Sequence, residues 1–181
     1  HYAIGQDWAP DDEAALATLR SQEVLFPFSD AQRSELIGEV IELLGAYRAM
    51  LGSSLPTLES RSVDRAELPL AVRRGELVWE GIVDRLYRVD GEWLLDDYKT
   101  DVQVVPERYH LQLGLYLEAL EGALGERPRG RLVFLREGVI VEPEREVLER
   151  AVSERMQGLG MPGGKFSIQL QPVADNTPSP H

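Results

Sequence analysis

The Asp90-Gly91 pair, with a strand-like apolar segment on either side of it, constrains the fold of this chain more than any other feature. Asp-Gly favours the tight two-residue turns that join neighbouring antiparallel strands. With one earlier segment, the pattern predicts an antiparallel meander of three strands at residues 63–72, 76–89 and 92–100. A turn at Asp90 and Gly91 would pair position 84 with about position 97.

Helical patterns and two further strands surround this meander. Apolar spacing and capping residues predict helices at residues 1–20, 30–51, 106–124 and 143–157, and strands at 132–135 and 139–141. This order predicts an α/β (α+β) fold, with a mixed central sheet flanked by helices. We expect one domain over residues 1–157, and a flexible Gly/Pro-rich C-terminal tail over 158–181.

Composition excludes several kinds of site. The chain of 181 residues has no cysteine, which excludes disulfide scaffolds, thiolate zinc sites, cysteine nucleophiles and cysteine-ligated iron–sulfur clusters. No apolar run approaches the roughly 18 residues of a membrane span, so we expect no membrane partner and a cytoplasmic protein. A net charge of −12 repels polyanions at long range, but it does not fix the sign of one cleft that holds a cation.

Two acids and a lysine are expected to meet on the meander. Asp97 and Lys99 are two residues apart on one strand and so share a face, while Asp84 lies across the hairpin from them. Adjacent Asp96 should point the other way. Carboxylates among apolar neighbours favour a hard dication such as Mg²⁺ or Mn²⁺. The alternative is a pair of cross-strand ion pairs, Asp84–Lys99 and Asp97–Arg85.

Three motifs follow one another at characteristic spacing. They are Gly-Ile-Val-Asp-Arg-Leu at 81–86, Asp-Tyr-Lys-Thr at 97–100, and Tyr-His-Leu-Gln-Leu-Gly-Leu-Tyr at 109–116. Over roughly residues 60–140 the chain resembles the RecB-type branch of the PD-(D/E)xK nuclease superfamily, most of all the C-terminal nuclease domain of RecB and AddA helicase-nucleases. The resemblance implies a restriction-endonuclease-like fold. The iron–sulfur members of this branch are excluded, because they need four cysteines and this chain has none.

The resemblance also implies a set of metal ligands. Asp84, Asp97 and the backbone carbonyl of Tyr98 would hold Mg²⁺ or Mn²⁺, and Lys99 would be the catalytic lysine, which orients or deprotonates a water. A histidine from an early helix is a further ligand in the family. His1 resembles it, without the glycine that precedes it in the family motif. The alternative is that His1 is a residue left from a tag.

Further residues would line the site. Gln112 and Tyr116 match the family's Gln-x-x-x-Tyr helix motif beside the active site. The stretch 108–110, Arg-Tyr-His, is expected to form a basic, stacking lip for a single strand. Glu67 and Glu80 are either acids that support the metal ligands or exposed strand-edge residues.

These expectations combine into one function. We expect a metal-dependent DNA nuclease, an exonuclease acting on single strands, in double-strand break repair and recombination at the nucleoid. The helicase motor that feeds it would lie in the same longer chain or on a separate partner protein. The alternatives are a non-catalytic DNA-binding or scaffold module of the same fold, and an acidic interaction domain.

Overall fold

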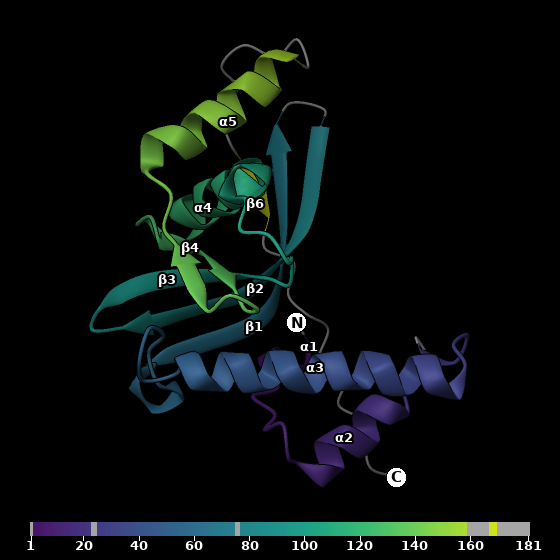
Figure 1. The fold of residues 1–181 in the computed structure, drawn as a ribbon. Coiled ribbons are helices and arrows are strands. Elements are labelled where there is room, and N and C mark those ends of the chain that lie inside the picture. The colour runs from purple at the N-terminus through teal and green to yellow at the C-terminus, as the bar shows by residue number, and fades with distance from the viewer. Residues whose placement is uncertain (1, 23–24, 75–76, 159–166, 170–181) are drawn as a thin grey trace, which may run out of the picture.

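A mixed six-stranded sheet with helices on both faces organises the chain (Figure 1). The computed structural model describes residues 2–22, 25–74, 77–158 and 167–169. The strand order is β5-β4-β3-β2-β1-β6. Helix α3 (Asp30–Met50) crosses one face, whereas α4 (His110–Leu124) and α5 (Arg145–Gly158) lie on the other. Within the described residues no helix is long and apolar enough to span a membrane.

The predicted meander is confirmed. Strands β1 (Val63–Arg74), β2 (Leu77–Val89) and β3 (Glu92–Lys99) pair in succession as antiparallel neighbours. Asp90 and Gly91 both have positive φ, 51° and 86°, as the tight hairpin turn requires. Pairing of β2 with β3 runs from Val89 opposite Glu92 to Arg85 opposite Asp96. The next residues on the two strands are Asp84 and Asp97, in the register that the sequence predicts.

The chain then crosses over to make a parallel pair. A short 3₁₀ helix η3 (Pro106–Tyr109) leads into α4, and the two together fill the predicted helix at 106–124. Gly125 ends α4 in the left-handed conformation, with φ 77°. Strand β4 (Arg129–Phe134) runs parallel to β3, and β5 (Val139–Val141) pairs antiparallel to β4. β4 begins three residues before the expected 132–135.

The prediction of one helix over residues 1–20 is wrong. Two helices, α1 (Tyr2–Gly5) and α2 (Glu13–Arg20), are separated by a turn at Asp7, where φ is 56°. The Asp12 carboxylate accepts hydrogen bonds from the first N–H groups of α2, so a new helix starts there. The apolar spacing correctly predicts α2, but the turn depends on tertiary contacts that the pattern does not contain.

Helices α3 and α5 lie close to their predicted positions, whereas two short elements were not predicted. Ser29 and Gln32 form a capping box at the start of α3, and a 3₁₀ turn η2 (Leu58–Ser60) precedes β1. Strand β6 (Ser167–Gln169) lies within the stretch expected as a tail, and it pairs antiparallel with β1. The rest of residues 159–181 lies outside the described residues.

Each face of the sheet has its own core. On the α4 side, apolar residues of β1 to β4 pack against the helix, with Val83, Leu95, Leu113 and Phe134 fully buried. On the α3 side, Tyr47 and Leu44 pack with Tyr98 and Val133. The two layers of packing hold β2 and β3 from both sides, which fixes Asp84 in the middle of β2 and Lys99 at the end of β3.

Candidate active site

Asp84, Asp97 and Lys99 come together under the α4 side of the sheet. All three are buried, with 7%, 2% and 7% of their surface exposed. The backbone N–H of Tyr98 donates a 2.7 Å hydrogen bond to Asp84 Oδ2, which ties β2 to β3 beyond their regular pairing. The hairpin therefore brings both acids and the ammonium group to one point, as the two-residue spacing predicts.

Lys99 is held by three groups. Its Nζ lies 2.8 Å from Asp97 Oδ2 and donates a 3.3 Å hydrogen bond to Gln112 Oε1. The same nitrogen lies 4.0 Å from the ring centroid of Tyr109, within the range of a cation–π interaction. The lysine is thus fixed in position by β3 and by the start of α4, with little freedom to leave the acids.

The ion-pair alternative fails in its detail. It expected Asp97 to pair with Arg85, but the Arg85 guanidinium lies on the opposite face. There it donates to Asp7 and Asp64 at 2.6–2.9 Å and to the Ile4 carbonyl at 3.0 Å. On the α4 side, Asp97 therefore pairs with Lys99 and not with Arg85.

The pKa of Asp97 reflects its burial beside Lys99 and Asp84. Burial raises the pKa of its carboxyl to about 6, the nearby Lys99 ammonium lowers it, and Asp84 raises it again. Burial and the neighbouring Asp84 both disfavour the charged form of Asp97. A further positive charge placed between the two acids would favour that charged form.

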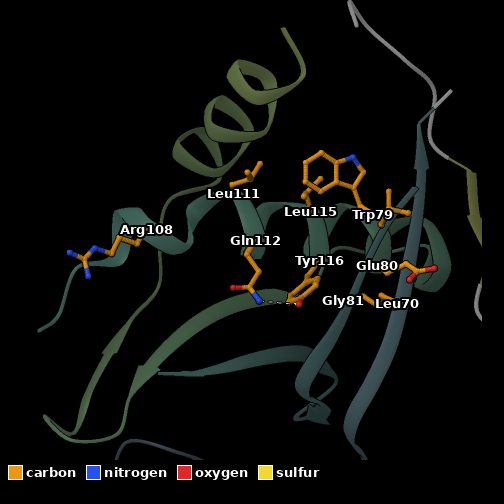
Figure 2. Close-up of a pocket in the computed structure, with 10 residues that line it drawn as sticks. Leu70, Trp79, Glu80, Gly81, Arg108, Leu111, Gln112, Leu115 and Tyr116 are labelled. Carbon is orange, nitrogen blue, oxygen red and sulfur yellow. Dashed lines mark hydrogen bonds between the residues drawn. The ribbon is translucent and has the colours of Figure 1, made fainter. Parts of the chain in front are cut away.

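Gln112 and Tyr116 extend the cluster along α4. Gln112 accepts from Lys99 through Oε1 and donates from Nε2 to the Tyr116 hydroxyl at 3.0 Å (Figure 2). Burial raises the pKa of Tyr116. The two residues lie one helical turn apart on one face, so the helix delivers both side chains to the same place.

Gly81 makes room for this arrangement. A Cβ at Gly81 would lie 2.6 Å from the Tyr116 hydroxyl oxygen and 2.7 Å from its ring carbon Cε1. No real Cβ approaches that closely, so a side chain at position 81 would displace the tyrosine. Gly81 of the first motif therefore leaves the space that the Tyr116 side chain of the third motif occupies.

Comparison with known proteins agrees with this geometry. The family model described as the PD-(D/E)XK nuclease superfamily matches residues 4–167, most of the chain. The chain belongs to this superfamily. The predicted restriction-endonuclease-like α/β fold and the resemblance to AddA-type and RecB-type nucleases are thereby confirmed.

Curated relatives of this superfamily member are large proteins. An ATP-dependent helicase/nuclease subunit from Listeria monocytogenes serotype 4a is 26% identical over 163 residues, covering 75% of the chain and 13% of the relative. A protein of the same name from Heliobacterium modesticaldum is 34% identical over 94 residues, covering 45% of the chain and 6% of the relative. The chain thus spans about an eighth or less of these relatives' length.

Among solved structures, protein VC1899 from Vibrio cholerae covers 74% of the chain and 31% of its own length. The TM-score is 0.32 and the sequence identity is 17%.

The donor atoms of this PD-(D/E)XK site fit a hard divalent cation. Asp84 and Asp97 offer carboxylate oxygens in a buried, negatively charged position, and Mg²⁺ typically binds one or two carboxylates and keeps several waters. In the part of the chain that the structure describes, no group of three or more His, Asp or Glu side chains gathers that could hold a metal. The remaining ligands would thus be backbone oxygen, water, or a residue outside that part.

Tyr98 can contribute only its backbone. Its ring is 1% exposed and packs edge-on against Tyr47 on the α3 side, with centroids 5.5 Å apart. The residue nevertheless lies between Asp97 and Lys99, and its N–H already binds Asp84. The expectation that its carbonyl serves as a ligand, rather than its hydroxyl, is compatible with this packing.

His1 lies outside the described residues, but the helix that follows it is positioned. Gly5 of α1 packs against β1, where its own Cβ would stand 3.1 Å from the Ala66 Cβ. Arg85 also ties Ile4 and Asp7 to β2. The amino-terminal helix is therefore attached to the strand that carries Asp84.

Asp96 is a structural residue, as the alternation of β3 predicts. It is fully buried on the α3 side and accepts two hydrogen bonds from the Arg131 guanidinium, at 2.7 and 2.9 Å. The Tyr87 hydroxyl donates to the same carboxylate at 2.8 Å. Adjacent aspartates therefore serve opposite faces of one strand.

Glu67 and Glu80 have different surroundings. Glu67 stands opposite Asp84 in the β1–β2 register, flanked by the pairs Ala66–Arg85 and Leu68–Val83, and its φ is 50°. Regular alternation breaks at this point, which the sequence pattern did not predict. Glu80 is exposed at the edge of a pocket beside α4.

Tyr109 has a role that the sequence reasoning missed. It was expected to stack on a DNA strand, but its ring covers the Lys99 ammonium and its hydroxyl donates to Asp101 Oδ2 at 2.5 Å. Its helical spacing gives a usable signal, because residues 109, 112 and 116 fall on one face. Tyr109 and Gln112 contact Lys99 directly, and Tyr116 accepts a hydrogen bond from Gln112.

Proposed function

We propose that this domain is a Mg²⁺- or Mn²⁺-dependent deoxyribonuclease that cuts single-stranded DNA as an exonuclease. The buried cluster of Asp84, Asp97 and Lys99 carries the proposal. Two buried carboxylates side by side offer the oxygen donors of a cation site, and the Lys99 ammonium beside them suits a reaction in which negative charge develops on a phosphoryl oxygen.

The chain's own residues have distinct tasks in this scheme. Asp84 and Asp97, with the Tyr98 carbonyl, would hold the ion, which when bound polarises the phosphodiester and lowers the pKa of water. Lys99 steadies charge on the phosphate or orients the attacking water. Gln112 and Tyr109 hold the lysine in place beside Asp97.

We also propose that a helicase supplies the strand. The relatives are named helicase/nuclease subunits, and the chain covers only a small part of them. A motor that delivers DNA would let a domain of net charge −12 act without strong affinity of its own. Such a substrate would put the domain at the nucleoid, in break repair.

His1 is proposed as a further metal ligand. Support comes from α1, which packs on β1 beside the position opposite Asp84. Calorimetric titration with Mn²⁺ tests it: His1→Ala should weaken binding, whereas equal affinity would remove His1 from the ligand set.

Cleavage of labelled DNA tests the nuclease function. The wild-type chain should degrade single-stranded DNA with Mg²⁺ or Mn²⁺ and not with EDTA, and should act more slowly on blunt duplex. Asp84→Asn and Lys99→Ala should abolish cleavage. Asp30→Asn, at an aspartate whose side chain is 99% exposed, is the matched control and should keep it.

The same assay separates the non-catalytic alternative. A folded wild-type chain that binds single-stranded DNA but leaves it intact with either metal would reject the enzyme and favour a binding module. A chain that cuts equally with and without Lys99 would reject the catalytic assignment.

A further inference from the structure

A pocket of about 290 Å³ lies beside the candidate active site, between α4 and the far half of the β1–β2 hairpin (Figure 2). Leu111 and Leu115 form its helix wall, and Trp79 forms part of its strand wall. Its size is near the lower end of ligand pockets in proteins, which run from about 300 Å³. It therefore suits a small, flat, largely apolar group.

The pocket continues directly into the catalytic cluster. Gln112 and Tyr116 line it, and Gln112 accepts a 3.3 Å hydrogen bond from Lys99 and donates a 3.0 Å hydrogen bond to the Tyr116 hydroxyl. A group seated in the pocket would thus contact the same side chains that position the lysine. Occupancy of the pocket and the geometry of the active site are physically linked.

Trp79 gives the pocket a flat aromatic wall. Its indole is partly buried and packs against the core beside α4, so its position is fixed. Every nucleobase has a flat face that stacks on aromatic rings.

Charge at the pocket rim favours the same occupant. Arg108 is exposed at the end of the pocket away from Trp79, and its guanidinium points outward (Figure 2). A base inserted past Arg108 would leave its phosphate near that guanidinium. Glu80 at the strand side is a poor neighbour for phosphate, so the backbone would pass on the Arg108 side.

We propose that this pocket receives the unpaired nucleobase of a nucleotide adjoining the scissile phosphate. The inference rests on the proposed nuclease function and adds the source of its strand preference. A base held in a duplex is stacked and paired, and it cannot enter without being extruded. Single strands would be cut faster because their bases are free to occupy the pocket.

A series of oligonucleotides with one abasic residue at successive positions tests the proposal on the wild-type chain. The probe is a 5′-labelled oligothymidylate that carries one tetrahydrofuran abasic residue, moved one position at a time, with Mn²⁺ present. Cleavage at the bond next to the abasic residue should fall roughly tenfold, the loss expected from one base–aromatic stack. Equal cleavage at every position would overturn the pocket assignment.

Variants identify the wall that holds the base. In Trp79→Ala the abasic penalty should shrink to about threefold or less, since the stack is already lost. Trp79→Phe keeps a ring and should retain most of the penalty, which covers the case where the alanine variant fails to fold. Trp93→Ala is the control, because Trp93 packs on the same core but does not line the pocket. It should keep the full penalty.

The outcomes separate the two proposals. If the intact oligonucleotide is not cut with either metal, the nuclease function fails. If it is cut evenly whether or not a base is present, the function stands and the nucleobase pocket is wrong. An abasic penalty that is unchanged in both Trp79 variants would also reject this pocket as its cause.

Discussion

The Tyr116 hydroxyl oxygen lies where the side chain of residue 81 would begin, 2.6 Å from a Cβ placed on Gly81. The glycine has no positive φ to explain it, so its smallness serves this close approach. The tyrosine in turn holds Gln112, which holds Lys99. A methyl group added at residue 81 is therefore expected to displace Tyr116 and, through Gln112, to shift Lys99.

Gly81→Ala should lower DNA cleavage by about ten- to a hundredfold, because small displacements of positioning groups are costly in catalysis. Gly45→Ala is the matched control. Gly45 lies within α3 with nothing near its absent Cβ, so that variant should gain about 0.5–1 kcal/mol of stability and keep its activity. Cleavage rates and thermal unfolding of both variants decide the matter. Unchanged cleavage by Gly81→Ala would show that Tyr116 does not position the lysine.

Asp96→Asn should destabilise the fold by about 3 kcal/mol or more, because it leaves the buried Arg131 guanidinium without its carboxylate. Asp97→Asn, one residue away, should lose cleavage without a comparable loss of stability. Urea unfolding measures the free energies of both variants. A reversal of their order would contradict the assignment of the two aspartates to opposite roles.

Stability without metal should fall as pH rises from about 4 to about 6. The pKa of Asp97 is raised to about 6 in the fold, so the folded chain keeps a proton that the unfolded chain has already released in this window. Below the window both states are protonated, and above it both are charged. Melting temperatures in EDTA should therefore decline across the window more steeply for wild type than for Asp97→Asn. Parallel curves would refute the raised pKa.

Tyr109→Leu should slow cleavage roughly fivefold, equivalent to about 1 kcal/mol for a lost cation–π contact with Lys99. Tyr109→Phe separates the ring from the hydroxyl, since it loses only the hydrogen bond to Asp101. It should stay near the wild-type rate. If the phenylalanine variant is the slower of the two, the hydroxyl matters and the ring does not.

Local rules predicted the centre of this fold well. The Asp90-Gly91 turn has one strongly favoured geometry, and its register alone brings Asp84 opposite Asp97. Two-residue alternation then separates Asp96 from Asp97 and Lys99. Such statements need only strand periodicity and a turn type, both of which depend on neighbours in sequence.

Features that depend on contacts between residues far apart in the sequence were not predicted. The turn at Asp7 is held by Arg85, almost eighty residues away, so no local pattern marks it. The break in alternation at Glu67 lies within a run of residues that reads as an ordinary strand. Likewise, the sequence pattern indicates a surface aromatic residue at Tyr109, and only the fold shows that its ring lies over Lys99.

Arg85 and Asp84 are consecutive residues that face opposite sides of β2. Arg85 donates hydrogen bonds to Asp7 and to the Ile4 carbonyl in the amino-terminal segment, and Asp84 lies in the acidic cluster. Force applied to the amino-terminal segment, by a neighbouring domain or by moving DNA, would consequently travel to a reaction-side carboxylate across a single peptide bond.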